Sequence, residues 1–389
     1  MNPRMFRTLT LALVMLTASE VLILNWARLA SEGAGLSLRT ATAIFLVLGA
    51  INALLFPAAR RRVRATGLGL FFSRSWILSS VTLLLTGLML TTVLAAIYGT
   101  TWLFGAEASR EVASVWIGGA IVVLGLGSGL WGSTVGNARV RVDRISLPIR
   151  GLPGELAGLS VVHITDLHIG PLLLPERLAK FVERINALDA DLIVITGDIF
   201  DFDPDYIEQG CRGLAALSAK RGVYAVLGNH DHYTGTEKVV DGLRSHTSIR
   251  VLRDEWEAVH HEGAQLIIAG IEDPAEGWME KNSESEALVR LAGEIPDHLP
   301  CLLLAHRPSF FDHAEKLGFS LVLSGHTHGG QIAMPFATNT NASRMISDRT
   351  RGLYRRGDST MYVNRGLGMA GLPLRINCPR EIALIELVP

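Results

Sequence analysis

Five short patches of the sequence place aspartate, asparagine or histidine directly after a run of apolar residues. The patches are Asp166-Leu167-His168, Gly197-Asp198, Gly228-Asn229-His230-Asp231, His306 and Gly325-His326-Thr327-His328. Carboxylate, carboxamide and imidazole groups together suit Mn²⁺, Fe or Zn²⁺, and no thiolate stands among them. One His-X-His pair would be a weak signal, because two surface histidines look the same. Five such patches in one chain indicate a metal centre.

The apolar runs before these patches predict buried strands. They span residues 159–164, 192–196, 223–227, 301–305 and 321–323. In open α/β sheets, sites form at the C-terminal ends of strands, and glycine-flanked loops free neighbouring side chains from the alternation of a strand. We therefore expect the patches to converge if the five strands share one core. Helical spacing between the runs, as in Pro175–Ile185, indicates intervening helices and a mixed sheet.

The order and spacing of the patches resemble the calcineurin-like metallophosphoesterase family: D-x-H, G-D, G-N-H-D, a lone H, then G-H-x-H. All five blocks are present, and the resemblance covers about residues 159–389. The stretch Asn364-Arg365-Gly366-Leu367-Gly368 is similar to one in the membrane-linked branch, the YkuE-type and transmembrane metallophosphoesterase proteins. The resemblance implies an α/β fold of two packed mixed β-sheets flanked by helices, preceded here by a four-helix transmembrane region.

The resemblance also implies a role for each site residue. Asp166, His168 and His328 would bind a first divalent ion, Asn229, His306 and His326 a second, and Asp198 would bridge them. Two such ions can clamp a phosphoryl group and ionise a bound water. His230 would protonate the leaving alkoxide while Asp231 orients its ring, although spacing alone also allows His230 to be a ligand.

Other polar residues near the patches each have a functional and a structural interpretation. Arg365 is either a phosphate contact or an ordinary surface arginine. Asp201 either hydrogen-bonds to a metal ligand or forms a turn. His232 is expected to be solvated, and His163, inside a predicted strand, to be a satisfied core histidine.

The composition indicates that part of the chain lies in lipid. Of 389 residues, 49% are hydrophobic and only 19% are charged, whereas soluble enzymes usually carry more charge. The net charge of −1 gives no bulk electrostatic reason to expect nucleic acid as a partner. Three widely spaced cysteines argue against a disulfide framework and against a cysteine-rich zinc site.

The apolar excess lies in the N-terminal third. Runs at about residues 9–26, 41–56, 76–98 and 115–131 each approach the roughly 20 residues that cross a bilayer. A soluble helical domain with buried helices is the alternative. We expect residues 1–135 to form a transmembrane region of about four helices, 136–156 a linker with the first strand, and 157–389 the catalytic domain.

Arginines predict the orientation in the membrane. Five lie between the second and third runs, and four follow the fourth run: Arg60, Arg61, Arg62, Arg64 and Arg74, then Arg139, Arg141, Arg144 and Arg150. The positive-inside rule places these segments in the cytoplasm. We therefore expect a multi-pass protein of the inner (cell) membrane whose catalytic domain is cytoplasmic.

Several functions fit these features. The first is a membrane-anchored dimetal phosphodiesterase that hydrolyses phosphodiester or pyrophosphate bonds, with membrane lipids as partners. By analogy with related hydrolases of lipid A synthesis, its substrate would be lipid-linked, as is UDP-2,3-diacylglucosamine. Apolar residues beside the patches, such as Leu173 and Phe202, could hold an acyl chain or belong to the core. The alternatives are a phosphoprotein phosphatase, a nucleotide phosphodiesterase, or a non-catalytic membrane sensor or scaffold.

Overall fold

The computed structural model describes residues 3–32, 35–62, 68–105, 107–275, 285–371 and 373–389. These residues form two compact units, which we describe separately. The first is Met1–Val135, and the second comprises Gly136–Gly371 and Arg375–Pro389.

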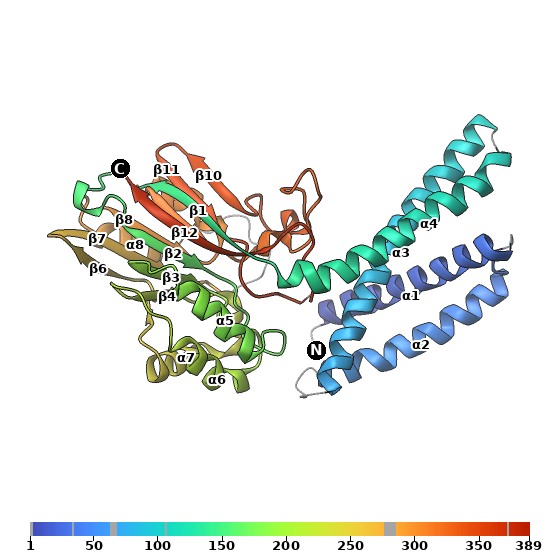
Figure 1. The fold of residues 1–389 in the computed structure, drawn as a ribbon, viewed down its shortest axis with the longest axis horizontal. Coiled ribbons are helices and arrows are strands. Elements are labelled where there is room, and N and C mark those ends of the chain that lie inside the picture. Colours follow the sequence, from blue (N-terminus) through green and yellow to red (C-terminus); the bar gives the residue numbers. More distant parts are fainter. Residues whose placement is uncertain (1–2, 33–34, 63–67, 106, 276–284, 372) are drawn as a thin grey trace. The chain divides into compact units, whose positions relative to one another are not determined.

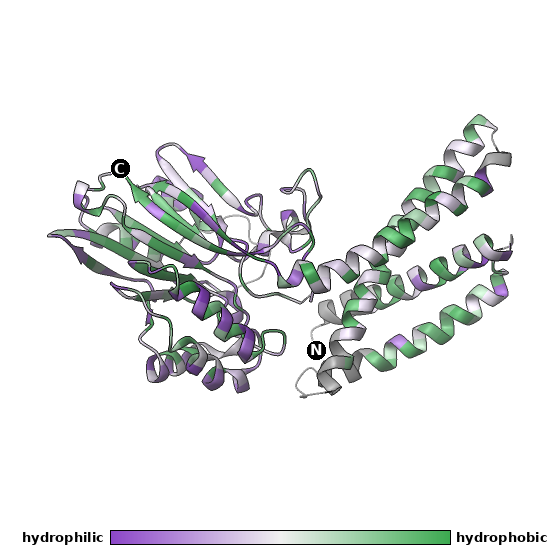
Figure 2. Cartoon of the chain, viewed as in Figure 1, coloured by the Kyte–Doolittle hydropathy of each residue, from purple (hydrophilic) through white to green (hydrophobic). Residues whose placement is uncertain are grey.

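The first unit consists of long apolar helices. They are α1 (Pro3–Glu32), α2 (Leu38–Arg62), α3 (Leu68–Phe104) and α4 (Glu107–Trp131), and a π-helical turn at Gly132–Gly136 follows α4. Hydrophobic residues predominate along the described parts of these helices (Figure 2). Each helix contains a stretch of 18 to 30 residues that is long and apolar enough to cross a bilayer, as expected for a membrane protein.

The predicted orientation of these spans rests largely on side chains outside the described part of the chain. The whole of Arg64 and the side chains of Arg60, Arg61, Arg62 and Arg74 belong there. The cytoplasmic position of the second unit therefore stays a prediction.

The second unit contains two six-stranded mixed sheets (Figure 1). The first has the order β1 (Val140–Pro148), β12 (Arg380–Val388), β2 (Ser160–Ile164), β3 (Leu192–Thr196), β4 (Val223–Val226) and β5 (Arg250–Val251). The second has the order β10 (Gly352–Arg356), β11 (Ser359–Val363), β9 (Leu321–Ser324), β8 (Cys301–Ala305), β7 (Ala264–Ile271) and β6 (Glu255–His261). Strands β2 to β5 run parallel in one sheet and β7, β8, β9 and β11 in the other.

Alternating side chains bind these sheets to each other and to helices. Val161 and Val194 point between the sheets toward residues such as Leu302, whereas Val162 packs on the outer helices. The outer helices of the first sheet are α5 (Pro175–Asn186), α6 (Ile207–Leu214) and α7 (Asn229–His246); those of the second are α8 (Glu286–Glu294) and α9 (Phe311–Lys316). The predicted fold of two packed mixed sheets flanked by helices is confirmed.

Candidate metal centre

The predicted metal ligands lie on the loops that follow β2, β3, β4, β8 and β9. Asp166 and His168 follow β2, Asp198 follows β3, and Asn229 begins α7 directly after β4 and its short loop. His306 comes directly after β8. The two sheets pack face to face, so these C-terminal ends meet, and six of the ligands form groups of converging side chains: Asp166, His168, Asp198, His306, His326 and His328.

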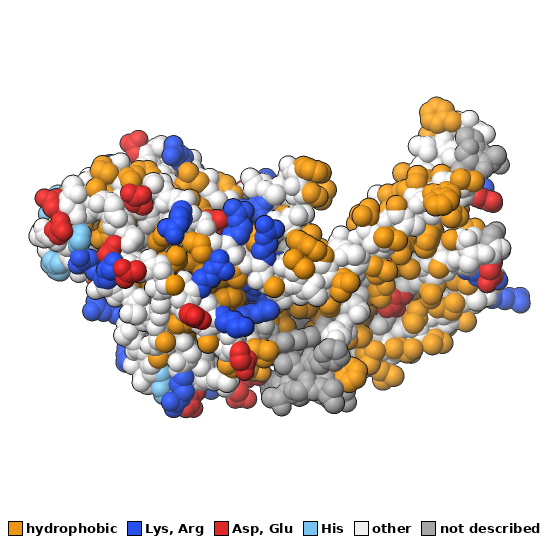
Figure 3. Space-filling view, viewed as in Figure 1, with side chains coloured by type: hydrophobic (Ala, Val, Ile, Leu, Met, Phe, Trp, Pro, Cys, Tyr) orange, Lys and Arg blue, Asp and Glu red, His pale blue; other side chains and the backbone are white. Residues whose placement is uncertain are grey.

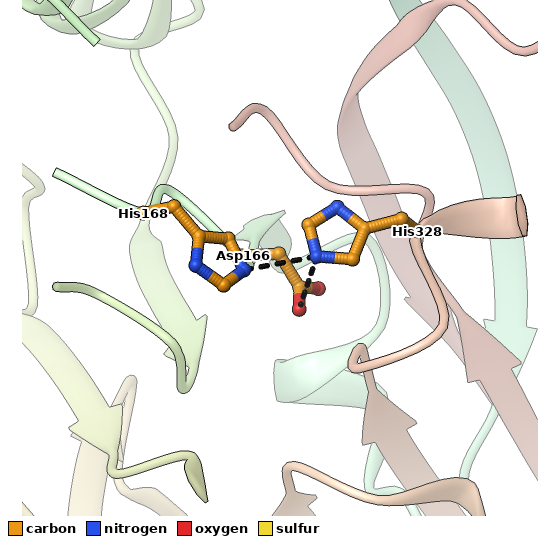
Figure 4. Close-up of side chains that lie close together, drawn as sticks. All are labelled: Asp166, His168 and His328. Atoms are coloured by element: carbon orange, nitrogen blue, oxygen red, sulfur yellow. Dashed lines mark hydrogen bonds and ion pairs between the residues drawn. The ribbon is translucent and has the colours of Figure 1, made fainter. Parts of the chain in front are cut away.

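Asp166, His168 and His328 form the first group. The Nε2 atoms of His168 and His328 are 2.9 Å apart, and Asp166 Oδ1 lies 3.5 Å from the same His328 nitrogen. Figure 4 shows both rings turned toward each other with the Asp166 carboxylate beside the gap between them. All three side chains are buried. Two ring nitrogens and a carboxylate that face one another in a buried volume are a suitable ligand set for a divalent cation.

Asp198, His306 and His326 form the second group. His306 Nε2 lies 3.1 Å from His326 Nδ1 and 3.4 Å from Asp198 Oδ2. The same Asp198 oxygen lies 3.5 Å from His168 Nε2, in the first group. The Asp198 carboxylate therefore reaches both groups at once, which is the position that a bridging ligand requires.

Asn229 also lies in this centre. Its side chain is buried, and its Oδ1 atom has no hydrogen-bond partner among the described residues. A buried amide oxygen without a partner is costly, and a cation would satisfy it. The preceding Gly228 permits the close packing, because a Cβ there would lie 2.3 Å from Asp198 Oδ1.

Hydrogen bonds fix the orientation of several ligands. His306 Nδ1 donates to the carbonyl of Thr196 at 2.7 Å, which turns His306 Nε2 toward Asp198 Oδ2. The backbone N–H of His326 donates to the Asp166 carboxylate at 3.0 Å. This contact ties the loop after β9 to the loop after β2, so the two halves of the first group hold each other in place.

Strained backbone conformations accompany this convergence. Five ligands have left-handed φ angles between 45° and 69°: Asp166, His168, Asp198, His326 and His328. Residues other than glycine rarely adopt such angles, and they persist where the surroundings impose them, typically at functional sites. The sharp turns let side chains from adjacent positions on a loop point into one small volume.

Burial and charge set the protonation of the ligands. Burial would raise the pKa of Asp198, but neighbouring histidines, His306 foremost, hold it well below its ordinary value. Burial would lower the pKa of His306, but Asp198 raises it to about 10. Burial lowers the pKa of His326 to about 3 and holds that of His328 well below its ordinary value. The centre therefore offers an ionised bridge and two neutral rings with available lone pairs.

The structure corrects the predicted role of Asp231. Its carboxylate turns back to accept the backbone N–H groups of Phe200 at 2.8 Å, Gly228 at 2.9 Å and Ile199 at 3.2 Å. Asp231 stands in the first turn of α7, so its side chain caps the start of that helix. The prediction that Asp231 orients the ring of His230 is wrong.

Asp201 contacts His230 instead. His230 Nδ1 lies 3.1 Å from Asp201 Oδ1, and His168 Nδ1 lies 3.4 Å from the same oxygen. Asp201 is thus a hydrogen-bond partner near the ligands, one of the two roles that the sequence left open. His230 also lies close to His168 and Asp198, in a third possible metal-binding group, so its alternative role as a ligand stays open.

The side chain of Arg365 is paired with two carboxylates. Its Nε donates to Glu381 Oε2 at 2.7 Å, and its Nη2 contacts the Asp143 carboxylate. Its side chain is 11% exposed. Two carboxylates therefore hold the guanidinium, so Arg365 is not an ordinary surface arginine, and its role as a phosphate contact stays a prediction.

The predictions for His163 and His232 agree with the structure only in part. His163 is a buried core histidine of β2, as expected, but it is only partly satisfied: its Nε2 pairs with Thr196 Oγ1 at 2.8 Å, and its Nδ1 has no hydrogen-bond partner among the described residues. His232 is not solvated as expected, because its side chain is 13% exposed and its Nδ1 pairs with Thr236 Oγ1 at 2.8 Å.

An exposed aromatic pair beside His230 was not predicted as a unit. The ring centroids of Phe202 and His230 are 4.5 Å apart, and Tyr233 stacks on Phe202 at 5.8 Å with nearly parallel planes. Phe202 and Tyr233 are 58% and 45% exposed. Helical spacing could have revealed Tyr233, because residues three apart on α7 share a face.

Comparisons with known proteins agree with this geometry. The Calcineurin-like phosphoesterase family profile matches residues 159–330. The metallophosphoesterase Cj0846 of Campylobacter jejuni is 32% identical, over 61% of this chain and 61% of its own. The transmembrane protein with metallophosphoesterase domain of Bos taurus is 30% identical, over 63% of this chain and 56% of its own. The chain thus spans less than two thirds of these two relatives.

A bacterial relative is matched over most of its length. The metallophosphoesterase YkuE of Bacillus subtilis is 32% identical, and the match covers 61% of this chain and 81% of that protein. Residues 159–330, which the family profile matches, contain the five ligand-bearing loops. The chain belongs to the calcineurin-like metallophosphoesterase family.

Proposed function

We propose that this protein is a membrane-anchored phosphoesterase that uses two divalent metal ions to hydrolyse phosphodiester or pyrophosphate bonds. The position of Asp198 carries the proposal. A single carboxylate oxygen lies 3.5 Å from His168 Nε2 and 3.4 Å from His306 Nε2, between two groups of otherwise separate ligands. One ion would need no such shared carboxylate, whereas a pair of ions does.

The chain supplies a suitable ligand set for each ion. Asp166, His168 and His328 would hold one ion, Asn229, His306 and His326 the other, and Asp198 both. When bound, such ions polarise a phosphoryl group and lower the pKa of a coordinated water. The mixture of imidazole, carboxylate and amide oxygen fits Mn²⁺, Fe or Zn²⁺.

His230 is the residue that we propose as the proton donor. Asp201 holds its Nδ1, so a protonated ring would present its Nε2–H toward the leaving oxygen. Departure of an alkoxide is faster when an acid protonates it in the transition state. Burial would raise the pKa of Asp201, but its hydrogen bonds to His168 and His230 lower it to about 2, so an ionised carboxylate lies beside the His230 ring.

The substrate that we propose is a phosphoester linked to a lipid, of the kind that UDP-2,3-diacylglucosamine represents. Four helices able to span a bilayer would tether the domain that carries the centre to a membrane, and the exposed rings of Phe202 and Tyr233 offer apolar area beside His230. We further propose that the centre faces the cytoplasm at the inner (cell) membrane, following the positions of the arginines.

A nucleotide diester is the second candidate substrate. Phe202 and Tyr233 are almost parallel, at 4°, and exposed flat rings stack well on a planar base. The two candidates differ in what they require, because a nucleotide needs no detergent-dispersed lipid for turnover.

The first experiment measures activity and metal content together. Purified full-length protein would be stripped with a chelator, reloaded with Mn²⁺, Fe²⁺ or Zn²⁺, and assayed with bis(p-nitrophenyl) phosphate. Asp198→Ala tests the bridge, and Asp205→Ala, at an exposed carboxylate on the neighbouring turn, is the matched control.

We expect two ions per chain and hydrolysis that only Asp198→Ala abolishes. Full activity in Asp198→Ala would contradict the dimetal proposal. Tight binding of metal without turnover of nitrophenyl, nucleotide or lipid phosphoesters would favour the sensor or scaffold.

A further inference from the structure

An exposed apolar loop follows the metal-binding turn of His328. Residues 331–343 contain no aspartate, glutamate, lysine, arginine or histidine, and every residue from 334 to 340 is exposed. Phe336 is 102% exposed, Met345 74% and Met334 57%. Large apolar side chains gathered on one projection usually mark a surface that another apolar phase covers.

The base of this loop is well fixed. Ala333 N–H donates to the carbonyl of Ile376 at 3.0 Å, and Ile376 N–H donates to the carbonyl of Gln331 at 2.9 Å. Ala333 also pairs with Asn341 across the base, and Asn341 Nδ2 donates to Thr350 Oγ1 at 3.1 Å. The apolar side chains are therefore held outward by an ordered base.

The loop lies at the end of the second unit where the chain arrives from the last apolar span. That span ends at Gly136, and the next residue, Asn137, accepts a hydrogen bond from Arg380 Nε through its carbonyl at 2.8 Å. Arg380 follows Ile376 by four residues, a distance of at most about 14 Å even in a fully extended chain. The base of the loop therefore lies close to Asn137, at the start of the second unit and directly after the last apolar span.

Basic side chains lie beside Met345 and near the base of the loop. Arg344 is exposed beside Met345, and Arg351 is half-buried, with Nη1 on the carbonyl of Asn377 at 3.4 Å. Arg139 is exposed two residues after Asn137. Figure 3 shows hydrophobic side chains at projecting parts of this unit and lysine or arginine side chains on the neighbouring surface. Apolar tips flanked by arginines are typical of segments that lie in the headgroup region of a membrane.

We propose that residues 331–345 form a membrane-docking loop. The loop binds the surface of the bilayer in which the four helices lie, and Met334, Phe336 and Met345 insert among the lipids. Arg344 and Arg351 then contact anionic headgroups. Because His328 is three residues before Gln331, docking holds the first group of ligands next to the lipid surface. The loop would bind lipid whether or not the centre is catalytic.

The test uses the full-length protein in lipid nanodiscs and an environment-sensitive label on a new cysteine. Phe336→Cys reports on the tip, and His298→Cys is the control, because His298 is exposed in the turn before β8, at the opposite end of the strands from the metal centre. Cys211 and Cys378 are buried, and Cys301 is half-buried, so labelling of the unmodified chain gives the background.

We expect the label at position 336, and not that at position 298, to shift to shorter emission wavelengths and to be quenched by lipids with a doxyl group on the acyl chain. Equal emission and no quenching at both positions would overturn the proposal. A shift at position 336 without quenching would place the tip against protein and would also overturn it.

A second variant tests whether the arginine beside the tip contacts anionic headgroups. In nanodiscs with equal phosphatidylcholine and phosphatidylglycerol, Arg344→Glu should reduce the quenching at position 336; in phosphatidylcholine alone the same substitution should have a smaller effect. An identical loss in both lipids would contradict the role of anionic headgroups. These measurements do not depend on hydrolysis. They therefore test the docking loop even if the proposed enzymatic function is wrong.

Discussion

The carboxylate of Asp201 lies between His230 and His168, with one oxygen 3.1 Å from His230 Nδ1 and 3.4 Å from His168 Nδ1. It therefore connects the proposed proton donor to a ligand of the first group. A partner of this kind fixes the tautomer and the orientation of an imidazole ring. Asp201 is a positioning residue that acts through both rings.

We expect Asp201→Asn to lower kcat by about 10- to 100-fold, the usual effect of removing a carboxylate behind a ligand histidine. An amide can keep a hydrogen bond to one ring but cannot stabilise a charged one. Steady-state kinetics on the metal-loaded protein would measure the loss, with Asp205→Asn as the exposed control. A raised KM with unchanged kcat would contradict the proposed role.

The sequence could not show which of two aspartates, Asp201 or Asp231, contacts the ring of His230. Asp231 is adjacent to His230 in the chain, whereas Asp201 is 29 residues away. The start of α7 turns the Asp231 side chain back toward Gly228, while the loop after β3 carries Asp201 to the ring. Sequence neighbours at a helix start point in different directions, and only the packing of two loops settles which carboxylate meets a given ring.

Other features were predictable because they are local. Apolar runs that end in ligand residues gave the strands and the convergence of the loops, and long apolar runs gave the four candidate spans. The environment of Arg365 was not predictable, because its partner Asp143 lies 222 residues away and the pairing of β1 with β12 brings it close. The aromatic pair likewise joins Phe202, on the loop after β3, to Tyr233 on α7, two segments that no local pattern relates.

We expect Asp231→Ala to reduce stability rather than to act through catalysis alone. Its buried carboxylate accepts three backbone N–H groups, and each donor left unsatisfied costs about 1–3 kcal/mol. Thermal unfolding of the purified protein, followed in the chelated and the metal-loaded state, would measure this. Asp231→Asn keeps an acceptor oxygen and should lose less. A wild-type unfolding temperature for Asp231→Ala would refute the capping role.

We expect Phe202→Ala to weaken turnover of substrates with aromatic leaving groups. Its ring stacks on Tyr233 and lies 4.5 Å from His230, so an aromatic group that leaves past His230 would contact it. Such contacts contribute about 0.5–1.5 kcal/mol, which corresponds to a factor of about 2 to 13 in kcat/KM. The measurement compares diesters with aryl and alkyl leaving groups. Exposed Phe336, in the proposed docking loop, gives the control Phe336→Ala, which should leave turnover of these soluble diesters unchanged. Equal losses on aryl and alkyl diesters would show that Phe202 does not contact the leaving group.

Arg375 is a buried cation that supports the loop under Asp166. Its Nη2 donates to the carbonyls of Arg365 at 3.0 Å, Gly366 at 3.1 Å and Gly368 at 2.7 Å. In turn, Gly368 N–H donates to the carbonyl of Asp166 at 2.6 Å. The planar fork of one guanidinium therefore holds a loop that packs directly on a predicted ligand.

We expect Arg375→Lys to lower metal affinity in the first group, by about 10- to 100-fold as for other residues that support ligands. Lysine keeps the charge but cannot reach several carbonyls at once, so the loop beneath Asp166 would loosen. Titration of the stripped protein with Zn²⁺, read by calorimetry, should show one weakened and one unchanged site. Arg290→Lys, on the exposed face of α8, is the matched control and should bind both ions normally. Two sites of unaltered affinity in Arg375→Lys would mean that the loop keeps its position without the guanidinium.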